Sequence, residues 1–393
     1  MKLGVFYDLP YRSDGRTFSA DIPVLRFITS LPPRVEEVVL FGRLNPSPGT
    51  GVYALPTQHV RLVPLPFYPS IFDIRRLVAA FPGSCRRFSA ELENVDAVWL
   101  FGPNPLAILF ALIALARRKQ VFLGVRQDYP EYIGARLPSE RWRWALPVAN
   151  LMEHVFRLIS RRVPTTVEGE QIAKNYRVGR APVLSGGFSL IRRDELVPLE
   201  TALARPWDGE IKLVTVGRID PEKNPLLLLD IVEGLRERDP RWRLAVVGDG
   251  PLRGEVERAI AERGLGDAVE LLGYVPNGDA LWAVYRSSNA FLHVSLTEGA
   301  PMVFFEAESA GLPIVATDVG GVSAALGGGV RGLLVPPRDA GAAIGALERL
   351  AGDAELREQL IRTELEHATA NTTEAHLDKV AEFFASALRA RES

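Results

Sequence analysis

The chain has 393 residues, 47% of them hydrophobic and 24% charged, which is typical of folded globular proteins and excludes disordered or collagen-like chains. This length is comfortable for two domains. The single cysteine, Cys85, excludes a disulfide framework and a thiolate metal cluster, and it favours a reducing, cytoplasmic compartment.

The charge is divided unevenly along the chain. The formal net charge is −2, but residues 1–195 carry 26 Lys and Arg against 17 Asp and Glu, and residues 196–393 carry 20 against 31. The N-terminal half is therefore expected to meet an anionic partner, such as a membrane surface or a phosphorylated acceptor. The alternative is that the charges are scattered over a solvated surface.

The beginning of the chain leads directly into a predicted strand and lacks the pattern of a signal peptide. The most apolar stretch, residues 105–116, is shorter than the roughly 20 residues that a bilayer-spanning helix needs. We therefore expect a cytoplasmic protein, either free or peripheral on the inner face of the membrane.

Short runs rich in Val, Leu and Phe alternate with segments of helical periodicity, which predicts parallel sheets with crossover helices. The strands predicted in the first half are residues 2–7, 37–41, 60–65, 97–101, 121–126, 165–168 and 183–185. Those predicted in the second half are residues 211–217, 244–247, 269–272, 290–293, 313–317 and 332–335. After Asp339 the apolar spacing predicts helices to the end of the chain.

The domain junction is expected in the weakly periodic, Pro-containing residues 198–209, after which a new strand opens. The expected fold class is α/β, with two Rossmann-like domains facing across a cleft. The first domain would comprise residues 1–197 and the second residues 198–374, and a helix at about 375–393 would return to the first domain.

Glycine-rich turns follow several strands of the second half, at Gly217, Gly248 and Gly320-Gly321. Ligands of open α/β sheets collect at the carboxyl ends of strands, where glycine lets the backbone approach a phosphate. Several such turns together predict a nucleotide or phosphate site.

The segment 295–307 follows a predicted strand and must open a helix, because Pro301 suits the first helical turn. The N–H groups near Met302 and Val303 would then face a diphosphate, and Glu306, one turn further, would reach a hydroxyl group such as that of a ribose. The alternative is that Glu306 only stabilises the helix dipole.

Three charged residues near these turns are candidates for donor binding. Glu298 would accept hydrogen bonds from sugar hydroxyls, unless it is an ordinary exposed loop carboxylate. Arg218 and Lys223 lie just past the first strand of the second half and could clamp a diphosphate. The alternative for both is a solvated surface cation.

In combination these motifs resemble the retaining glycosyltransferases of family 4, which have the GT-B fold and a signature of two glutamates separated by seven residues. Glu298 and Glu306 match that spacing. The resemblance covers about residues 211–337 through the segments 216–218 with Lys223, 247–251, 273–276, 310–317, 320–321 and 332–337.

The resemblance implies a role for each matching residue. Glu306 would bind the ribose hydroxyls, Arg218 and Lys223 would stabilise the diphosphate, and Val275 would contact the base. The donor sugar and phosphates would be held by Glu298 with the backbone of Gly299, Ala300, Pro301, Met302 and Val303, beside Gly217 and Gly248.

The first half departs from the family pattern at two places. In place of a paired-glycine loop after the first strand it has a single Gly15, and in place of a His-Asp pair it has Arg126-Gln127-Asp128. Gln127 can form hydrogen bonds but cannot act as an acid or base. We expect Arg126, Gln127 and Asp128 on the acceptor side.

The resemblance implies a retaining mechanism by same-face attack, in which the leaving diphosphate takes the acceptor proton. The donor would be a nucleoside-diphosphate sugar and the acceptor a glycan or a lipid-linked saccharide, as in polysaccharide biosynthesis. No metal is expected, because Arg218, Lys223 and a helix terminus would supply the positive field. No cofactor and no nucleic-acid partner are expected either.

Residues 139–162 interleave Arg and Trp with apolar side chains, a pattern that suits a bilayer interface and a lipid-linked acceptor. The alternative is a pair of ordinary amphipathic helices packed on the domain.

Three other functions compete with transfer. A nucleotide-sugar epimerase or hydrolase and a catalytically silent sugar-nucleotide-binding subunit remain open. A dinucleotide-dependent oxidoreductase is disfavoured, because no glycine fingerprint follows the first strand.

Overall fold

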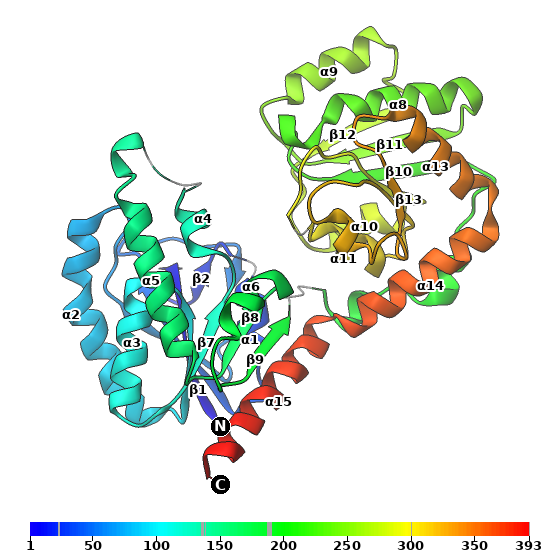
Figure 1. Ribbon diagram of the computed structural model, residues 1–393. Coiled ribbons are helices and arrows are strands. Elements are labelled where there is room, and N and C mark those ends of the chain that lie inside the picture. The colour runs from blue at the N-terminus through cyan, green and yellow to red at the C-terminus, as the bar shows by residue number, and fades with distance from the viewer. Residues whose placement is uncertain (23, 135–136, 138, 187–190, 300, 393) are drawn as a thin grey trace. The chain divides into compact units, whose positions relative to one another are not determined.

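The computed structural model describes residues 1–22, 24–134, 137, 139–186, 191–299 and 301–392. The chain forms two compact units, one of residues 1–190 with 373–393 and the other of residues 191–372 (Figure 1). The junction thus lies seven residues before the expected position. The junction lies earlier because Ile191 and Val197 are buried in the core of the second unit.

The first unit contains a sheet of nine strands. Seven of them run parallel in the order β5–β3–β1–β6–β7–β8–β9. Their bounds are β1 Lys2–Ser13, β3 Glu37–Leu44, β5 Val60–Leu65, β6 Ala97–Gly102, β7 Gln120–Val125, β8 Thr165–Glu168 and β9 Val183–Gly186. All seven were predicted from the sequence, with bounds that differ mostly by one residue.

Two strands differ by more: β3 was expected to end at residue 41 and continues to Leu44, and β1 was expected to end at residue 7 and continues to Ser13. The extension of β1 pairs antiparallel with β2 (Phe18–Ala20), and β2 pairs with β4 (Tyr53–Ala54). β2 and β4 were not predicted, because strands of three and two residues are too short to produce a periodic pattern.

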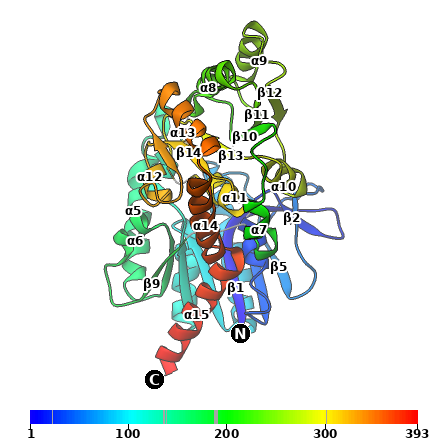
Figure 2. The same cartoon turned by 90° about the vertical axis from the view of Figure 1, so that its right-hand side faces the viewer.

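Helices cover both faces of this sheet. Their bounds are α1 Val24–Thr29, α2 Ile74–Glu91, α3 Pro105–Ala116, α4 Tyr129–Gly134, α5 Ala145–Ser160, α6 Glu170–Tyr176 and α15 Thr373–Glu392. Successive side chains of a strand point to opposite faces, so Phe6 packs with α2, α3 and α5, while Val5 packs with α1 and α15. Figure 2 shows α15 in front of the strands, on the face opposite to α2 and α3.

The second unit has a parallel sheet of six strands in the order β12–β11–β10–β13–β14–β15. The strand bounds are β10 Ile211–Val216, β11 Trp242–Val247, β12 Val269–Gly273, β13 Ala290–His293, β14 Ile314–Thr317 and β15 Leu333–Val335. This confirms the six strands predicted for the second half.

Helices cover both faces of the second sheet as well. One core joins the sheet to α8 (Pro225–Arg238), α9 (Arg253–Glu262) and α13 (Ala340–Gly352). The other joins it to α7 (Leu199–Leu203), α10 (Asp279–Arg286), α11 (Val303–Ser309), α12 (Val322–Ala325) and α14 (Ala354–Ala370). Two parallel-sheet units with helices on both faces confirm the expected α/β fold class.

Among the residues that the structure describes, no helix combines the length and the apolar character that crossing a bilayer requires.

Candidate functional site

The carboxyl ends of β10, β11 and β12 lie side by side in the second unit. The Gly217 N–H donates to the Val247 carbonyl at 2.9 Å, and the Gly248 N–H donates to the Gly273 carbonyl at 2.8 Å. Gly248 has a φ of +139°, and a Cβ at this position would lie 1.8 Å from the Gly217 oxygen. Only glycine fits there, so the glycine-rich turns form one surface of closely spaced backbone.

The loops after β13 and β14 continue this edge. The Gly321 N–H donates to the Glu298 carbonyl at 2.9 Å, and a Cβ on Gly320, whose φ is +53°, would lie 2.0 Å from the same oxygen. The Leu296 N–H donates to the carbonyl of Glu222, in the 3-10 turn Pro221–Lys223 that follows β10. The turns predicted from the sequence are therefore neighbours in space.

Glu298 is held by three donors. Its Oε1 accepts hydrogen bonds from His293 Nε2 at 2.8 Å, from Ser295 Oγ at 2.9 Å and from Lys223 Nζ. Burial by itself raises the pKa of Glu298, but the hydrogen bonds from His293, Lys223 and Ser295 outweigh it and lower the pKa to about 2. The side chain is only 10% exposed, so Glu298 is an ionised carboxylate in a fixed position rather than an exposed loop residue.

The remaining oxygen, Glu298 Oε2, makes no hydrogen bond to any residue that the structure describes. It can therefore accept a hydrogen bond from a ligand hydroxyl. Lys223 carries three N–H donors and uses one of them on Glu298, so it retains donors for an anion.

Neither His293 nor Ser295 was predicted as a site residue from the sequence. His293 is buried and is the last residue of β13, and Ser295 follows two residues later. A polar side chain at the carboxyl end of a strand was the available signal, since ligands of α/β sheets gather there.

Glu306 lies in the first turn of α11. The sequence had predicted Pro301 in the first turn of this helix. The helix begins at Val303, so Pro301 precedes it. The reason is that Met302 is the residue flanking the helix, and the first short-range bond is the Phe304 N–H to the Pro301 carbonyl.

A tyrosine from a neighbouring helix already contacts the Glu306 carboxylate. Tyr285 of α10 donates its hydroxyl to Glu306 Oε2 at 2.7 Å, and Asn277 Nδ2 lies 3.5 Å from Oε1. Burial raises the pKa of Glu306, the Tyr285 hydrogen bond lowers it, and the charge of Glu195 raises it, with a net increase. Asn277 follows β12 by four residues, close in sequence to Val275, which is partly buried beside the core.

Arg218 and Lys223, which the sequence grouped together, differ in their surroundings. Arg218 is 71% exposed and pairs with Asp220 at 3.0 Å and Glu222 at 2.5 Å. The structure therefore brings Lys223 to Glu298 but not Arg218. Gly299 and Met302 are exposed beside this site, Val303 is half-buried, Pro301 is buried, and Ala300 lies outside the described residues.

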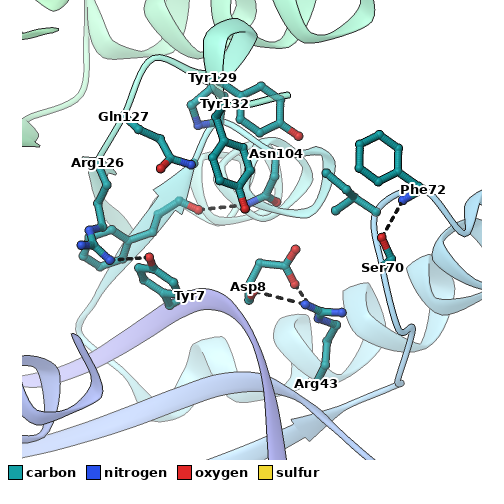
Figure 3. A pocket seen from close by; sticks show the side chains of 14 residues that line it. Tyr7, Asp8, Arg43, Ser70, Phe72, Asn104, Arg126, Gln127, Tyr129 and Tyr132 are labelled. Carbon is teal, nitrogen blue, oxygen red and sulfur yellow. Dashed lines mark hydrogen bonds and ion pairs between the residues drawn. The ribbon is translucent and has the colours of Figure 1, made fainter. Parts of the chain in front are cut away.

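The first unit has its own cavity, of about 280 Å³, at the carboxyl ends of β3, β6 and β7 and beside the middle of β1 (Figure 3). Asp8 lies at its floor, where it pairs with Arg43 Nε at 2.7 Å and accepts the Tyr68 hydroxyl at 2.6 Å. Aromatic side chains form much of the wall; they are Tyr7, Phe72, Phe101, Tyr129 and Tyr132.

Two of the three predicted acceptor-side residues line this cavity, Arg126 and Gln127. Arg126 donates to Glu168 Oε2 and to the Tyr7 hydroxyl, both at 2.7 Å. Burial raises the pKa of Tyr7, although the charge of Arg126 lowers it in part. The cavity therefore presents ion pairs and aromatic rings, a surface suited to a polyhydroxylated ligand.

The other two predicted residues of the first unit lie elsewhere. Asp128 Oδ1 accepts the Glu131 N–H at 3.1 Å, so Asp128 caps the beginning of α4. Gly15, with a φ of +88°, lies in the exposed turn between β1 and β2 and does not line the cavity. The reason is that β1 continues past residue 7 as a strand, where the family pattern has a loop.

Residues 204–366 match the family model for glycosyl transferases group 1. Over 233 residues the chain is 35% identical to D-inositol 3-phosphate glycosyltransferase from Saccharomonospora viridis, a match that covers 55% of this chain and 54% of the relative. It is 24% identical over 310 residues to sulfoquinovosyl transferase SQD2 from Arabidopsis thaliana, covering 76% and 57%. The chain thus spans about half the length of the curated relatives that it matches.

Solved structures resemble the chain over nearly its whole length. Sucrose-phosphate synthase from Thermosynechococcus elongatus has a TM-score of 0.65 at 20% identity, covering 99% of this chain and all of the other. Alr3699/HepE from Anabaena, in complex with UDP, has a TM-score of 0.65 at 16% identity, covering 98% and 100%. At these identities the likeness establishes the fold alone. The chain therefore has the GT-B fold of glycosyltransferases, and its residues 204–366 match the glycosyl transferases group 1 family.

Proposed function

We propose that the chain is a retaining glycosyltransferase of family 4, which transfers a hexose-type sugar from a nucleoside-diphosphate sugar to a hydroxyl group of a glycan or lipid-linked acceptor. The observation that carries the proposal is the cluster of Lys223, His293 and Glu298 beside the glycine turns at Gly217, Gly248 and Gly320. The named relatives are glycosyltransferases, and Alr3699/HepE has a structure in complex with UDP-glucose, which supports the same reading of this cluster.

In this proposal the donor phosphates bind at the glycine turns, where backbone N–H groups and Lys223 supply positive charge. Lys223 uses its remaining N–H donors on the leaving diphosphate. The exposed pair of Arg218 with Glu222 contributes only about 0–1 kcal/mol, so Arg218 can leave Glu222 to join Lys223, while its second partner, Asp220, is buried.

Glu298 and Glu306 hold the donor in different ways. Glu298 Oε2 accepts a hydroxyl of the sugar, and the ionised state that His293 and Lys223 maintain keeps it an acceptor. Glu306 faces the ribose, with Tyr285 setting the orientation of its carboxylate.

The chemistry then depends on electrostatic stabilisation. The acceptor hydroxyl attacks the face of the sugar from which the diphosphate departs, the bond from the anomeric carbon to the phosphate oxygen breaks, and the phosphate oxygen takes the hydroxyl proton. Removing one stabilising donor of this kind typically lowers kcat by about a hundredfold to a thousandfold. Metal and cofactor are not required in this scheme, because Lys223 and the backbone supply the positive field.

The acceptor is assigned to the cavity of the first unit. Its aromatic walls can stack on sugar rings, and Gln127 and Arg126 can donate hydrogen bonds to hydroxyl groups. Asp8 and Arg43 neutralise each other in its floor, which favours an uncharged saccharide at this position.

The test begins with a thermal-shift panel of nucleoside diphosphates and their sugars, since a ligand that binds the native state raises the Tm. The stabilising donor is then incubated with acceptor extracts, and the anomeric configuration of the product is read by NMR. We expect Lys223→Ala to lower kcat about a hundredfold. The exposed Lys212, which pairs with Glu210 in the same unit, provides the matched control Lys212→Ala with unchanged turnover.

Three results would contradict the proposal. Free sugar or a donor isomer as the only product would indicate a hydrolase or an epimerase. Binding without turnover would indicate a silent subunit, and an inverted product would exclude retention.

A further inference from the structure

Exposed apolar side chains gather on one helical layer of the first unit. Of the thirteen large hydrophobic side chains that are exposed among the described residues, eight lie on α2, α3 and α5 or directly before α5. They are Ile74, Val78, Leu112, Leu115, Trp144, Val148, Leu151 and Leu158. Single exposed apolar residues are ordinary, but a group on adjoining elements marks an interaction surface.

The three helices form one continuous layer on the same face of the sheet (Figure 1). Phe88 of α2 stacks on Phe110 of α3 with ring centroids 4.1 Å apart, and Phe156 of α5 belongs to the same buried cluster. Their inner sides are therefore buried together, and their outer sides adjoin. We call this outer side the α2–α3–α5 face.

On α5 the exposed apolar residues form a stripe. Trp144, Val148, Leu151 and Leu158 are 50%, 41%, 62% and 43% exposed, and their spacing of four, three and seven residues places them on one side of the helix. The opposite side is buried through Ala149 and Phe156. The helix is thus apolar on two sides, one of which is left exposed by the residues that the structure describes.

The same three helices and the residues directly beside them are rich in exposed arginines. Ten exposed arginines lie on the three helices or directly beside them: Arg75, Arg76, Arg86, Arg87, Arg117, Arg118, Arg141, Arg143, Arg161 and Arg162. Among the described side chains of residues 73–94, 105–119 and 139–162, Glu93 is the one exposed carboxylate. Such an excess of cations beside apolar side chains is complementary to anionic lipid headgroups over an acyl layer.

Aromatic rings connect this face to the cavity of the first unit. Phe72 lines the cavity and lies edge-on to Trp142, with centroids 5.4 Å apart. Trp142 in turn lies 5.5 Å from Trp144, the first residue of the exposed stripe. The cavity rim and the α2–α3–α5 face are therefore adjacent.

We propose that the α2–α3–α5 face binds the surface of an anionic lipid bilayer, with Trp144, Val148, Leu151 and Leu158 entering the headgroup region and the arginines contacting lipid phosphates. This inference goes beyond the proposed function, because surface binding needs neither donor nor turnover. Its consequence is that an acceptor carried by a lipid of the same bilayer is delivered at the rim of the cavity. An acidic protein would satisfy the arginines equally, but an apolar stripe with an indole at its end fits the depth of lipid headgroups.

The test is co-sedimentation of the full chain with vesicles of phosphatidylcholine alone or with roughly 30% phosphatidylglycerol, as a model of an anionic leaflet. We expect binding to the anionic vesicles only, and weaker binding in about 0.5 M salt, where charges are screened. Trp144→Ser/Leu151→Ser should lower the partition coefficient at least tenfold, because both side chains lose apolar contact with the bilayer.

A matched pair of double variants separates this face from general charge effects. Val148→Ser/Arg161→Glu changes the face, and Val330→Ser/Arg258→Glu makes the same two changes at exposed sites of the second unit. We expect the first to weaken partitioning at least about fivefold, from the contribution of one arginine alone, and the second to bind like the wild type. Circular dichroism melts establish that each variant is folded.

Several outcomes would overturn the proposal. These are no binding to anionic vesicles, equal binding to neutral vesicles, or unchanged binding of Trp144→Ser/Leu151→Ser. Capture by an acidic protein without any vesicle binding would also overturn it. None of these results depends on donor binding, which the thermal-shift panel measures separately.

Discussion

Replacing Glu298 by Gln tests whether this carboxylate is ionised and held by its neighbours. In the structure its Oε1 accepts hydrogen bonds from Lys223, His293 and Ser295. These interactions lower its pKa from 4.5 to about 2, a difference that corresponds to about 3 kcal/mol of folding free energy. Glu298→Gln keeps the size and one acceptor oxygen but removes the charge, so the loss at neutral pH is about 2–3 kcal/mol.

The pH dependence follows from the direction of the shift. A carboxyl whose pKa is lower in the folded state contributes its full stabilisation above the unfolded value of 4.5 and loses it as the pH falls toward 2. The difference in free energy of unfolding between wild type and Glu298→Gln is therefore at its full value at pH 6 and above. At pH 3 it is less than half of that.

The assay must report on the second unit by itself, since the chain has two units. Urea titrations at pH 6, 4.5 and 3, read by pulsed hydrogen exchange and mass spectrometry of peptides from β10 and β13, satisfy this condition. A difference that stays constant from pH 6 to pH 3, or a variant as stable as the wild type at pH 6, would refute the reasoning.

The remaining predictions concern four other positions. Glu306→Gln should have the opposite sign, because a raised pKa favours the neutral form; the variant is more stable than the wild type at pH 7, and urea titration should find the gain disappearing in acid. Tyr285→Phe removes a hydroxyl from that carboxylate and should lower the free energy of unfolding by about 1–3 kcal/mol and raise the donor KM; an unchanged KM would separate the tyrosine from donor binding. Gly320→Ala should cost about 1–3 kcal/mol in thermal or urea unfolding, whereas Gly266→Ala, with open space around its Cβ, should cost less than 1 kcal/mol. Gln127→Ala should raise the acceptor KM and leave the donor Kd unchanged in titration calorimetry; the reverse pattern would remove it from the acceptor side.

Features that depend on neighbouring residues in the chain were predictable from the sequence. The thirteen predicted strands were found because apolar runs separated by helical periodicity produce a strong local signal. The glycine turns at Gly248 and Gly320 were found because positive φ and close backbone approach admit little else. Glu298, Arg218 and Lys223 were expected at one donor site through the family resemblance, and of the two cations the structure brings Lys223 to Glu298.

Other features depended on the conformation of the loops that follow β10 and β13. His293 acquires its partner only when the loop after β13 folds back over the strand end, and Arg218 turns to Asp220 and Glu222 instead of joining Lys223. No periodicity encodes such choices, because several partners of equal chemistry lie within reach of a flexible side chain.

The acceptor-side cavity shows most clearly which residues could be predicted from the sequence and which could not. The sequence alone pointed to residues 126–128, a single segment after β7. In the tertiary structure Arg126 and Gln127 line the cavity, whereas Asp128 caps a helix. Tyr7 and Asp8 from β1 and Arg43 from β3 also line the cavity. The sequence by itself determined the parallel strands of both sheets and the glycine turns, since these follow from the spacing of apolar residues and glycines. Only the order of the strands in the sheet decided which side chains share a cavity, because that order joins residues that are far apart in the chain.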